Sequence, residues 1–227
     1  MQRNNRGPLR VASLLSGGKD SNFALHWSAA HGLEICCTIT LKPPEDSELL
    51  QFPAVELAKL QSEAMGIPNI YAEGKEEKLI ELMMEAKLRG AQYVVSGALL
   101  SDYQRQRMSA WAERVGLRPL APLWKINQEE YMRMLVRNGF EIMIIRVAAE
   151  GLGPEFLGKI LDEELVEEII RRARRYGFNP AFEGGEAETL VLKAPLYKKR
   201  LIVEGEKVHR GGGDWVYRIT RAYLSDL

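Results

Sequence analysis

The chain has 227 residues, enough for one large domain or two small ones, and its 46% apolar and 27% charged residues are typical of a folded globular protein. Basic and acidic residues both number 31, so the formal net charge is zero, which makes a dedicated nucleic-acid-binding protein unlikely. No apolar run approaches the roughly 18 residues of a membrane span, and the apolar stretch after residues 1–10 is too short for a signal peptide. We therefore expect a cytoplasmic protein without a membrane partner.

The first half of the chain predicts alternating strands and helices. The predicted strands cover residues 11–15, 34–41, 69–72 and 92–96. The predicted helices cover residues 20–31 and 52–65, and a third is marked by the apolar stripe Leu79, Leu82, Met83 and Ala86. Residues 42–50, with two prolines, are expected to form a loop. Repeated strand–helix units imply a Rossmann-like α/β fold with a parallel sheet, in which ligands bind at the carboxyl ends of the strands.

The composition changes over residues 117–124, which contain Pro119 and Pro122. Beyond this stretch we expect helices over residues 128–138 and 154–176. Strands are predicted at residues 141–148, 189–193, 200–204 with a turn at Gly205, and 215–223. The chain is therefore expected to comprise a first domain over residues 1–124 and a smaller α+β domain over residues 125–227.

The two cysteines, Cys36 and Cys37, are adjacent in a predicted strand. Adjacent strand residues point to opposite faces of a sheet, so the pair is poorly placed to bind one metal ion. Two cysteines also cannot build a disulfide framework. We expect buried thiols with a structural role.

The run Ser-Gly-Gly-Lys-Asp-Ser at residues 16–21 lies between the first predicted strand and the first predicted helix. A helix start carries partial positive charge and glycines allow close backbone approach, so this turn favours an anion such as phosphate. Lys19 adds a full charge, whereas Asp20 beside phosphates needs a bridging Mg²⁺ or a neighbouring cation. An ordinary strand-to-helix turn with polar caps is the alternative. The spacing differs from those of the Walker loop and the dinucleotide fingerprint.

Two further segments carry candidate functional residues. After Gly97, at the end of a predicted strand, Asp102 opens a helix that carries Arg105 and Arg107; these arginines are either surface charges or groups that reach phosphate. Residues 179–189 place three glutamates around a Gly-Gly pair. Such a loop is either a solvated turn or a site for Mg²⁺, a general base or a cationic group, which Phe182 would assist by a cation–π contact.

The first segment resembles the PP-loop of the ATP pyrophosphatases, which cut ATP between the α and β phosphates. Together the three segments resemble the diphthine–ammonia ligase family within that superfamily, over nearly the whole chain. Phe182, Ala187 and Lys193 depart from the family pattern, which affects the expected fit of the substrate more than the ATP chemistry. The resemblance implies a PP-loop fold of the adenine nucleotide alpha hydrolase type with a smaller C-terminal α+β domain.

The resemblance implies that diphthine on elongation factor 2, ammonia and ATP give diphthamide, AMP and pyrophosphate. The implied ATP-binding residues are Ser16, Gly17, Gly18, Lys19, Asp20, Ser21 and Gly97. The implied acceptor-binding residues are Asp102, Tyr103, Arg105, Arg107, Glu183, Gly184, Gly185, Glu186, Glu188 and Thr189. The implied catalytic residues are Lys19, Asp20, Glu186 and Glu188, with Asp20 also binding Mg²⁺.

Two other functions remain open at this point. The chain lacks the paired cysteines typical of tRNA thiolases, but an RNA-modifying ATP pyrophosphatase of the thiolase or lysidine type is an alternative. A non-catalytic ATP-binding module is the second. No candidate nucleophilic cysteine for releasing ammonia from glutamine is present, so the expected nitrogen donor is free ammonia.

Overall fold

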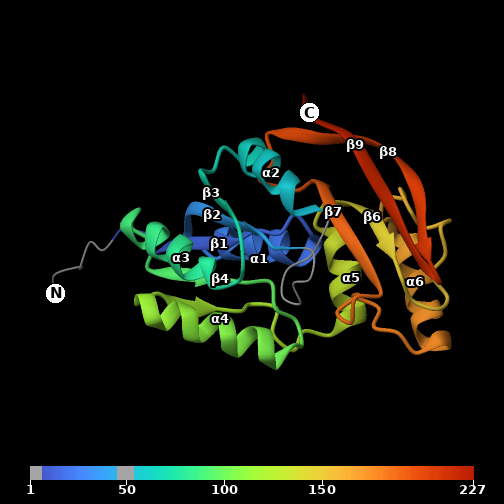
Figure 1. Cartoon of the computed structure of the whole chain (residues 1–227), viewed down its shortest axis with the longest axis horizontal. Coiled ribbons are helices and arrows are strands. Elements are labelled where there is room, and N and C mark those ends of the chain that lie inside the picture. The colour runs from blue at the N-terminus through green and yellow to red at the C-terminus, as the bar shows by residue number, and fades with distance from the viewer. Residues whose placement is uncertain (1–6, 45–53) are drawn as a thin grey trace.

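The computed structural model describes residues 7–44 and 54–227 and contains two sheets (Figure 1). The first sheet is parallel, with five strands in the order β3-β2-β1-β4-β5. Its strands are β1 (Arg10–Leu14), β2 (Glu34–Lys42), β3 (Asn69–Glu73), β4 (Tyr93–Val95) and β5 (Arg118–Leu120). The predicted parallel α/β fold is confirmed.

Helices cover both faces of this sheet, as the chain order required. Its helices are α1 (Lys19–Ala30), α2 (Ala58–Met65), α3 (Lys78–Leu88) and α4 (Asp102–Val115), with a 3₁₀ turn at Ala54–Leu57 before α2. Alternate strand residues point to opposite faces. Val11 and Val95 therefore pack with α1, while Ala12 and Val94 pack with α3 and α4.

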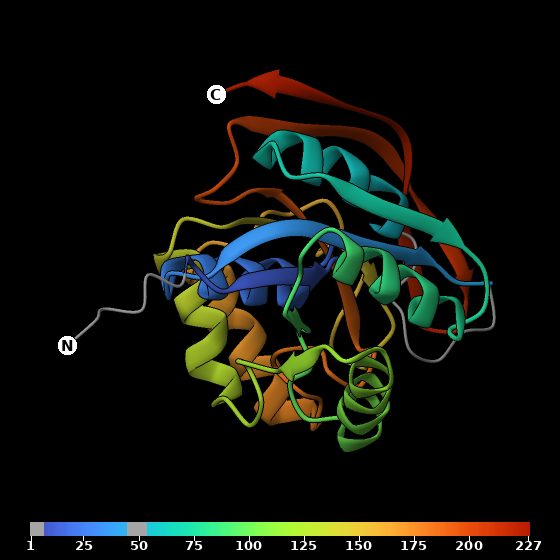
Figure 2. The ribbon, with the colours of Figure 1, turned by 90° about the vertical axis from the view of Figure 1, so that its left-hand side faces the viewer.

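The second sheet is antiparallel, with four strands in the order β7-β6-β9-β8. It comprises β6 (Glu141–Val147), β7 (Ala187–Lys193), β8 (Lys199–Gly211) and β9 (Asp214–Asp226), accompanied by helices α5 (Gln128–Arg137) and α6 (Glu163–Tyr176). Figures 1 and 2 show α2 lying between the parallel sheet and the long β8–β9 hairpin. A single apolar cluster joins α1 to α5, α6 and β7, so a division into two domains near residue 125 stays a prediction.

The structure differs from the sequence prediction in three elements. Helix α6 begins at Glu163, not at residue 154, because Asp162 caps it through the Leu165 amide (2.7 Å) and Gly158 has a φ of +80°. Gly205 is not a turn but a residue within β8, where a Cβ atom would lie 2.4 Å from the carbonyl oxygen of Arg218. Strand β5 was not expected, since Pro119 lies at its centre. It is an edge strand, where proline is tolerated.

The thiols of Cys36 and Cys37 lie on the same side of β2, contrary to the expected alternation. Val11 pairs with Ile35 and Ala12 with Cys37, so Cys36 is the extra residue of a β-bulge. The two Sγ atoms are 3.8 Å apart. Cys37 is buried as expected, whereas Cys36 is partly exposed.

Candidate active site

The turn over residues 16–18 joins the carboxyl end of β1 to the start of α1. Gly17 has a φ of +91°, a conformation that favours glycine. The hydroxyl of Ser21 accepts a hydrogen bond from the Ser16 amide (3.1 Å) and lies 3.2 Å from the Gly18 carbonyl, to which it donates. Strand, turn and helix therefore have the predicted arrangement, and the binding of an anion at this turn stays a prediction.

Gly97, after β4, lies directly against this turn. A Cβ atom on Gly97 would come within 2.5 Å of the carbonyl carbon of Asp20 and 2.7 Å of the Ser21 amide nitrogen. Both are backbone atoms, so no side-chain movement would relieve the contact. The ends of β1 and β4 meet in one crevice, as expected from adjacent parallel strands.

Lys19 and Asp20 form a partly buried ion pair at the start of α1. The Lys19 side chain is only 2% exposed, and its Nζ atom donates to both carboxylate oxygens of Asp20 at 2.8 Å. Lys19 thus supplies the cation that Asp20 needs beside phosphates. This pair puts one positive and one negative group where phosphates would approach the helix.

Two aromatic residues of the second half of the chain contact the Lys19–Asp20 pair. Tyr131 of α5 is fully buried and donates from its hydroxyl to Asp20 Oδ1 (2.8 Å). Its burial, and the negative charge of Asp20, raise the pKa of the Tyr131 phenol well above its usual value. Phe182 is 3% exposed, and Lys19 Nζ lies 5.7 Å from its ring centre. The proposed cation-receiving ring is therefore already in contact with a lysine of the chain itself.

Residues distant in sequence also support the backbone of the turn. The Lys19 amide donates to Thr189 Oγ1 (3.2 Å), and the Val191 amide donates to the Gly17 carbonyl (3.1 Å). Gln61 of α2 donates from Nε2 to the carbonyls of both Gly17 (2.9 Å) and Val191 (2.8 Å). Strand β7 and α2 thereby hold the turn in place.

The three glutamates of the Gly-Gly loop do not share one site. Glu183 Oε1 accepts from the Leu100 (3.1 Å) and Ser101 (3.2 Å) amides before α4. Glu186 accepts from the Asn179 and Gly184 amides within its own loop. In the part of the chain that the structure describes, no group of three or more acidic, histidine or cysteine residues could hold a metal ion. The predicted crowding of like charge is absent.

Burial raises the pKa of both Glu183 and Glu188, but the two carboxyl groups have different partners. Burial is the main reason that the pKa of Glu183 is raised, and the nearby charge of Asp20 raises it further. Glu188 is 8% exposed and accepts from Arg146 Nη1 (2.9 Å), and Arg146 also binds Asp214 (2.8 Å). Because side chains alternate along β7, Glu188 lies on the face opposite Thr189, away from the turn.

Comparisons with known proteins match both halves of the chain. A family model described as the diphthamide synthase N-terminal domain matches residues 9–119, and one for the diphthamide synthase C-terminal domain matches residues 127–224. A human protein named diphthine–ammonia ligase is 37% identical over 88% of this chain and 85% of its own length. The chain belongs to the diphthamide synthase family.

Other relatives carry the same name. The mouse diphthine–ammonia ligase is 36% identical over 96% of this chain and 92% of its own length. The Schizosaccharomyces pombe protein of that name is 31% identical over 96% of this chain but only 40% of its own, longer sequence. The similarity to members of the diphthamide synthase family thus extends through both sheets.

Within this diphthamide synthase fold, the predicted residues of α4 do not form one group. Arg107 pairs with Glu76 (2.9 Å) and contacts Tyr103, which is 59% exposed. Arg105 binds Asp102 (3.1 Å), and its guanidinium lies 4.7 Å from the ring centre of Trp124. Arg105 is therefore held near the crevice, while Arg107 is engaged by the segment before α3.

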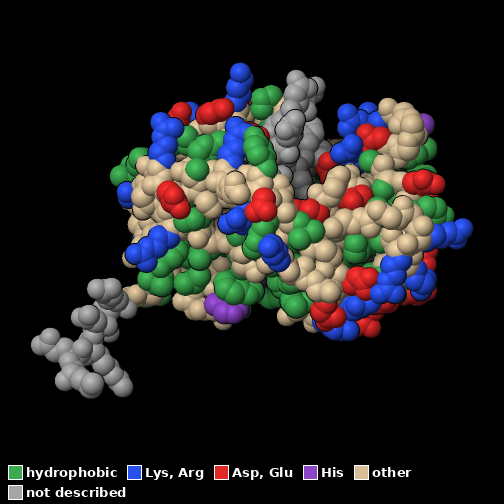
Figure 3. All heavy atoms as spheres, turned by 90° about the horizontal axis from the view of Figure 1, so that it is seen from below, with side chains coloured by type: hydrophobic (Ala, Val, Ile, Leu, Met, Phe, Trp, Pro, Cys, Tyr) green, Lys and Arg blue, Asp and Glu red, His purple; other side chains and the backbone are tan. Residues whose placement is uncertain are grey.

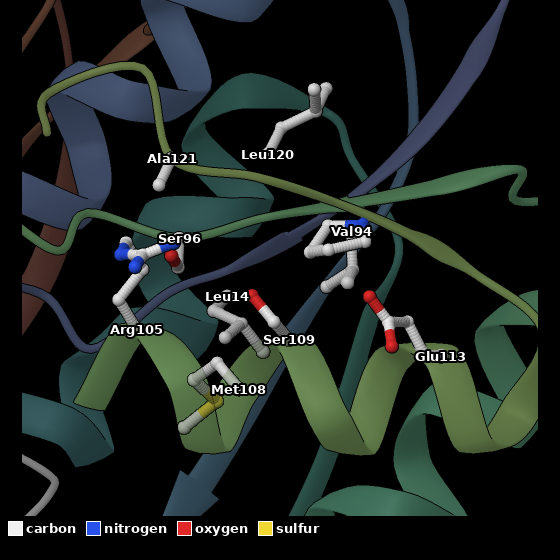
Figure 4. Close-up of a pocket in the computed structure, with 10 residues that line it drawn as sticks. Leu14, Val94, Ser96, Arg105, Met108, Ser109, Glu113, Leu120 and Ala121 are labelled. Atoms are coloured by element: carbon white, nitrogen blue, oxygen red, sulfur yellow. The ribbon is translucent and has the colours of Figure 1, made fainter. Parts of the chain in front are cut away.

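A cavity of about 320 Å³ lies under α4, beside the crevice (Figure 4). It is bounded by the ends of three adjacent strands, through Leu14 of β1, Val94 and Ser96 at β4, and Leu120 of β5. Arg105 lines it at the end next to Ser96, one residue before Gly97. The end of the cavity at Ser96 and Arg105 is therefore the end nearest the PP-loop.

Sequence reasoning missed Tyr131 and Gln61. Both lie on helices, and neither belongs to the three segments that carry the family resemblance. The position of Tyr131 in the apolar pattern of its helix is typical of a core residue. Only its contact with Asp20, 111 positions away, reveals another role. No signal in a single sequence would have found it.

Proposed function

We propose that this chain is a diphthine–ammonia ligase, which uses ATP to convert the carboxylate of diphthine to an amide and releases AMP and pyrophosphate. The observation that carries the proposal is the partly buried Lys19–Asp20 pair at the PP-loop, in a chain similar to ligases of that name along most of its length. The acceptor is a protein, which we propose to be elongation factor 2, and the reaction is proposed to occur in the cytoplasm. No helix among the described residues is long and apolar enough to span a membrane.

The proposed reaction has two steps. The diphthine carboxylate oxygen attacks the α-phosphorus of ATP; a new O–P bond forms, the bond to the β-phosphate oxygen breaks, and pyrophosphate leaves with that electron pair. Ammonia then attacks the carbonyl carbon of the acyl-adenylate, a C–N bond forms, AMP leaves and the nitrogen loses a proton. Positioning and charge stabilisation supply most of the rate in such transfers.

The residues of the turn suit the first step. The start of α1 binds phosphate, Lys19 offsets charge on the departing pyrophosphate, and Tyr131 orients the Asp20 carboxylate through its hydrogen bond. Mg²⁺ is usually held by one or two carboxylates together with substrate phosphates. The carboxylate of Asp20 would therefore be enough, with the phosphates of ATP, to hold the ion. When bound, the ion would neutralise phosphate charge.

For the second step we assign Glu183 the role that the family resemblance implied for Glu186 and Glu188. Glu186 is engaged by two amides of its own loop, and Glu188 by Arg146 on the far face of β7. The Glu183 carboxyl interacts with the charges of Asp20 and Lys19, and its pKa is raised by burial, which suits proton uptake from ammonium. Thr189 contributes through the Lys19 amide, not through the acceptor.

An RNA-modifying function has less support. Basic and acidic side chains are interspersed over the face in Figure 3, without a large patch of one sign. The arginines of α6, the most basic run of the chain, pair with glutamates: Arg172 with Glu168 (2.6 Å) and Arg174 with Glu129 (2.5 Å). Such a surface offers little attraction to a phosphate backbone.

The test combines the chain with diphthine-bearing elongation factor 2, ammonium and magnesium ATP. We expect AMP and pyrophosphate in equal amounts, with the mass change of amide formation on the modified histidine. Lys19→Ala should abolish both. Formation of ADP, or AMP without modification of the factor, would contradict the proposal.

A further inference from the structure

The cavity under α4 has opposite charges at its two ends. Arg105 and Glu113 lie on the same face of α4, eight residues or about 12 Å apart along the helix axis, and both line the cavity (Figure 4). Between them the walls are mostly apolar, with Leu14, Val94 and Met108, and include the hydroxyl of Ser109.

Both charged groups have capacity for a ligand. The Nε atom of Arg105 is buried without a hydrogen-bond partner, although its Nη2 atom binds Asp102. Glu113 is exposed and lines the other end of the cavity. A buried guanidinium donor without a partner is costly, so an acceptor atom at this position would be stabilising.

The positive end of the cavity is the end nearest the PP-loop. Arg105 lies beside Ser96, and the next residue, Gly97, is in contact with the backbone of Asp20. The proposed reaction requires a carboxylate at this place, because the carboxylate must reach the α-phosphate. The negative end, at Glu113, lies farther from the turn.

We infer that this cavity binds the tip of the diphthine side chain. We call the cavity the α4 groove and define it by its lining residues: Leu14, Val94, Ser96, Arg105, Met108, Ser109, Glu113, Pro119, Leu120 and Ala121. The inference rests on the proposed function. The carboxylate of diphthine binds Arg105, and its trimethylammonium group, on the same carbon, points toward Glu113. A quaternary ammonium cannot donate hydrogen bonds, so a carboxylate and apolar contacts are its suitable partners.

The size and chemistry of the α4 groove favour this ligand over part of the nucleotide. A volume of about 320 Å³ is at the lower limit for a small-molecule site and is too small for whole ATP. The neutral adenine ring would leave the charge of Glu113 unused. A carboxylate bound at Arg105 and a trimethylammonium group directed toward Glu113 would engage both charges of the groove.

A kinetic test varies diphthine-bearing elongation factor 2 at saturating ATP and ammonium. For Glu113→Gln we expect the KM for the factor to rise about fivefold, with the KM for ATP unchanged. Ser109→Phe should fill the groove and lower kcat/KM for the factor at least as much. Glu63→Gln, at an exposed carboxylate on α2, is the matched control and should leave both constants unchanged.

A binding test without the factor separates this inference from the proposed function. Glycine betaine carries a carboxylate and a trimethylammonium group on one carbon, as diphthine does. Saturation-transfer NMR should detect its methyl resonance with the wild-type chain and Glu63→Gln, and weakly or not at all with Glu113→Gln or Ser109→Phe. An equal signal in all four proteins, or none in the wild type, would overturn the inference. A rise in the KM for ATP of Glu113→Gln in the kinetic test would also overturn it. Failure of wild-type amidation alone would contradict the proposed function instead.

Discussion

Replacing Tyr131 by Phe removes a single hydroxyl group from the PP-loop site without changing the packing of the ring. The hydroxyl donates to Asp20 Oδ1 at 2.8 Å, in a residue with no exposed surface, so no water can take its place. A buried hydrogen bond to a charged group contributes about 2 kcal/mol. In a chain of this size that loss corresponds to a fall in Tm of about 4 to 8 °C.

The measurement is urea unfolding together with steady-state kinetics. We expect Tyr131→Phe to lower the free energy of unfolding and also to lower kcat, because Asp20 is less well oriented. Tyr223→Phe, at a partly exposed tyrosine of β9, is the control and should change neither. Unchanged kcat with lower stability would mean that Tyr131 only supports the fold. No change in either would refute the argument that this hydrogen bond orients Asp20.

Three other predictions address separate features. Gly97→Ala should cost about 1 to 3 kcal/mol of stability and raise the KM for ATP, because its Cβ would meet the Asp20 backbone; a Tm equal to that of wild type would contradict the close approach. Glu188→Gln should lower stability by about 1 to 3 kcal/mol with little effect on kcat, whereas Glu183→Gln should lower kcat; the reverse pattern would return the chemical role to Glu188. Burial lowers the pKa of His26 from 6.5 to about 4, so only the unfolded chain takes up this proton between those values. The His26 contribution should therefore remove about 3 kcal/mol of stability as the pH falls from 6.5 to 4, and His26→Gln should reduce this dependence in urea unfolding.

The parts of the fold that could be predicted are those with local signals. The parallel sheet follows from alternating apolar strands and helices, and the position of the PP-loop follows from glycines between a strand and a helix. Gly97 was placed beside it by topology alone, since adjacent parallel strands end at one edge. These features depend on neighbours in sequence or on a general rule of sheets.

The errors arose where side-chain direction depends on a precise strand boundary. Strand β7 begins at Ala187, two residues before the predicted start, and alternation along it directs Glu188 away from Thr189. The bulge at Cys36 likewise brings two thiols together that regular pairing would separate. The contact of Tyr131 with Asp20 depends on how α5 packs against α1, which no local pattern encodes.

The central claim is that the acceptor carboxylate attacks the α-phosphate at the PP-loop. It is tested most directly with elongation factor 2 whose diphthine carboxylate is labelled with ¹⁸O, by mass spectrometry of the nucleotide and phosphate products. The account predicts one ¹⁸O atom in the phosphate of AMP for each amide formed, and none in pyrophosphate. AMP without the label, or label in inorganic phosphate with ADP as the nucleotide, would contradict it.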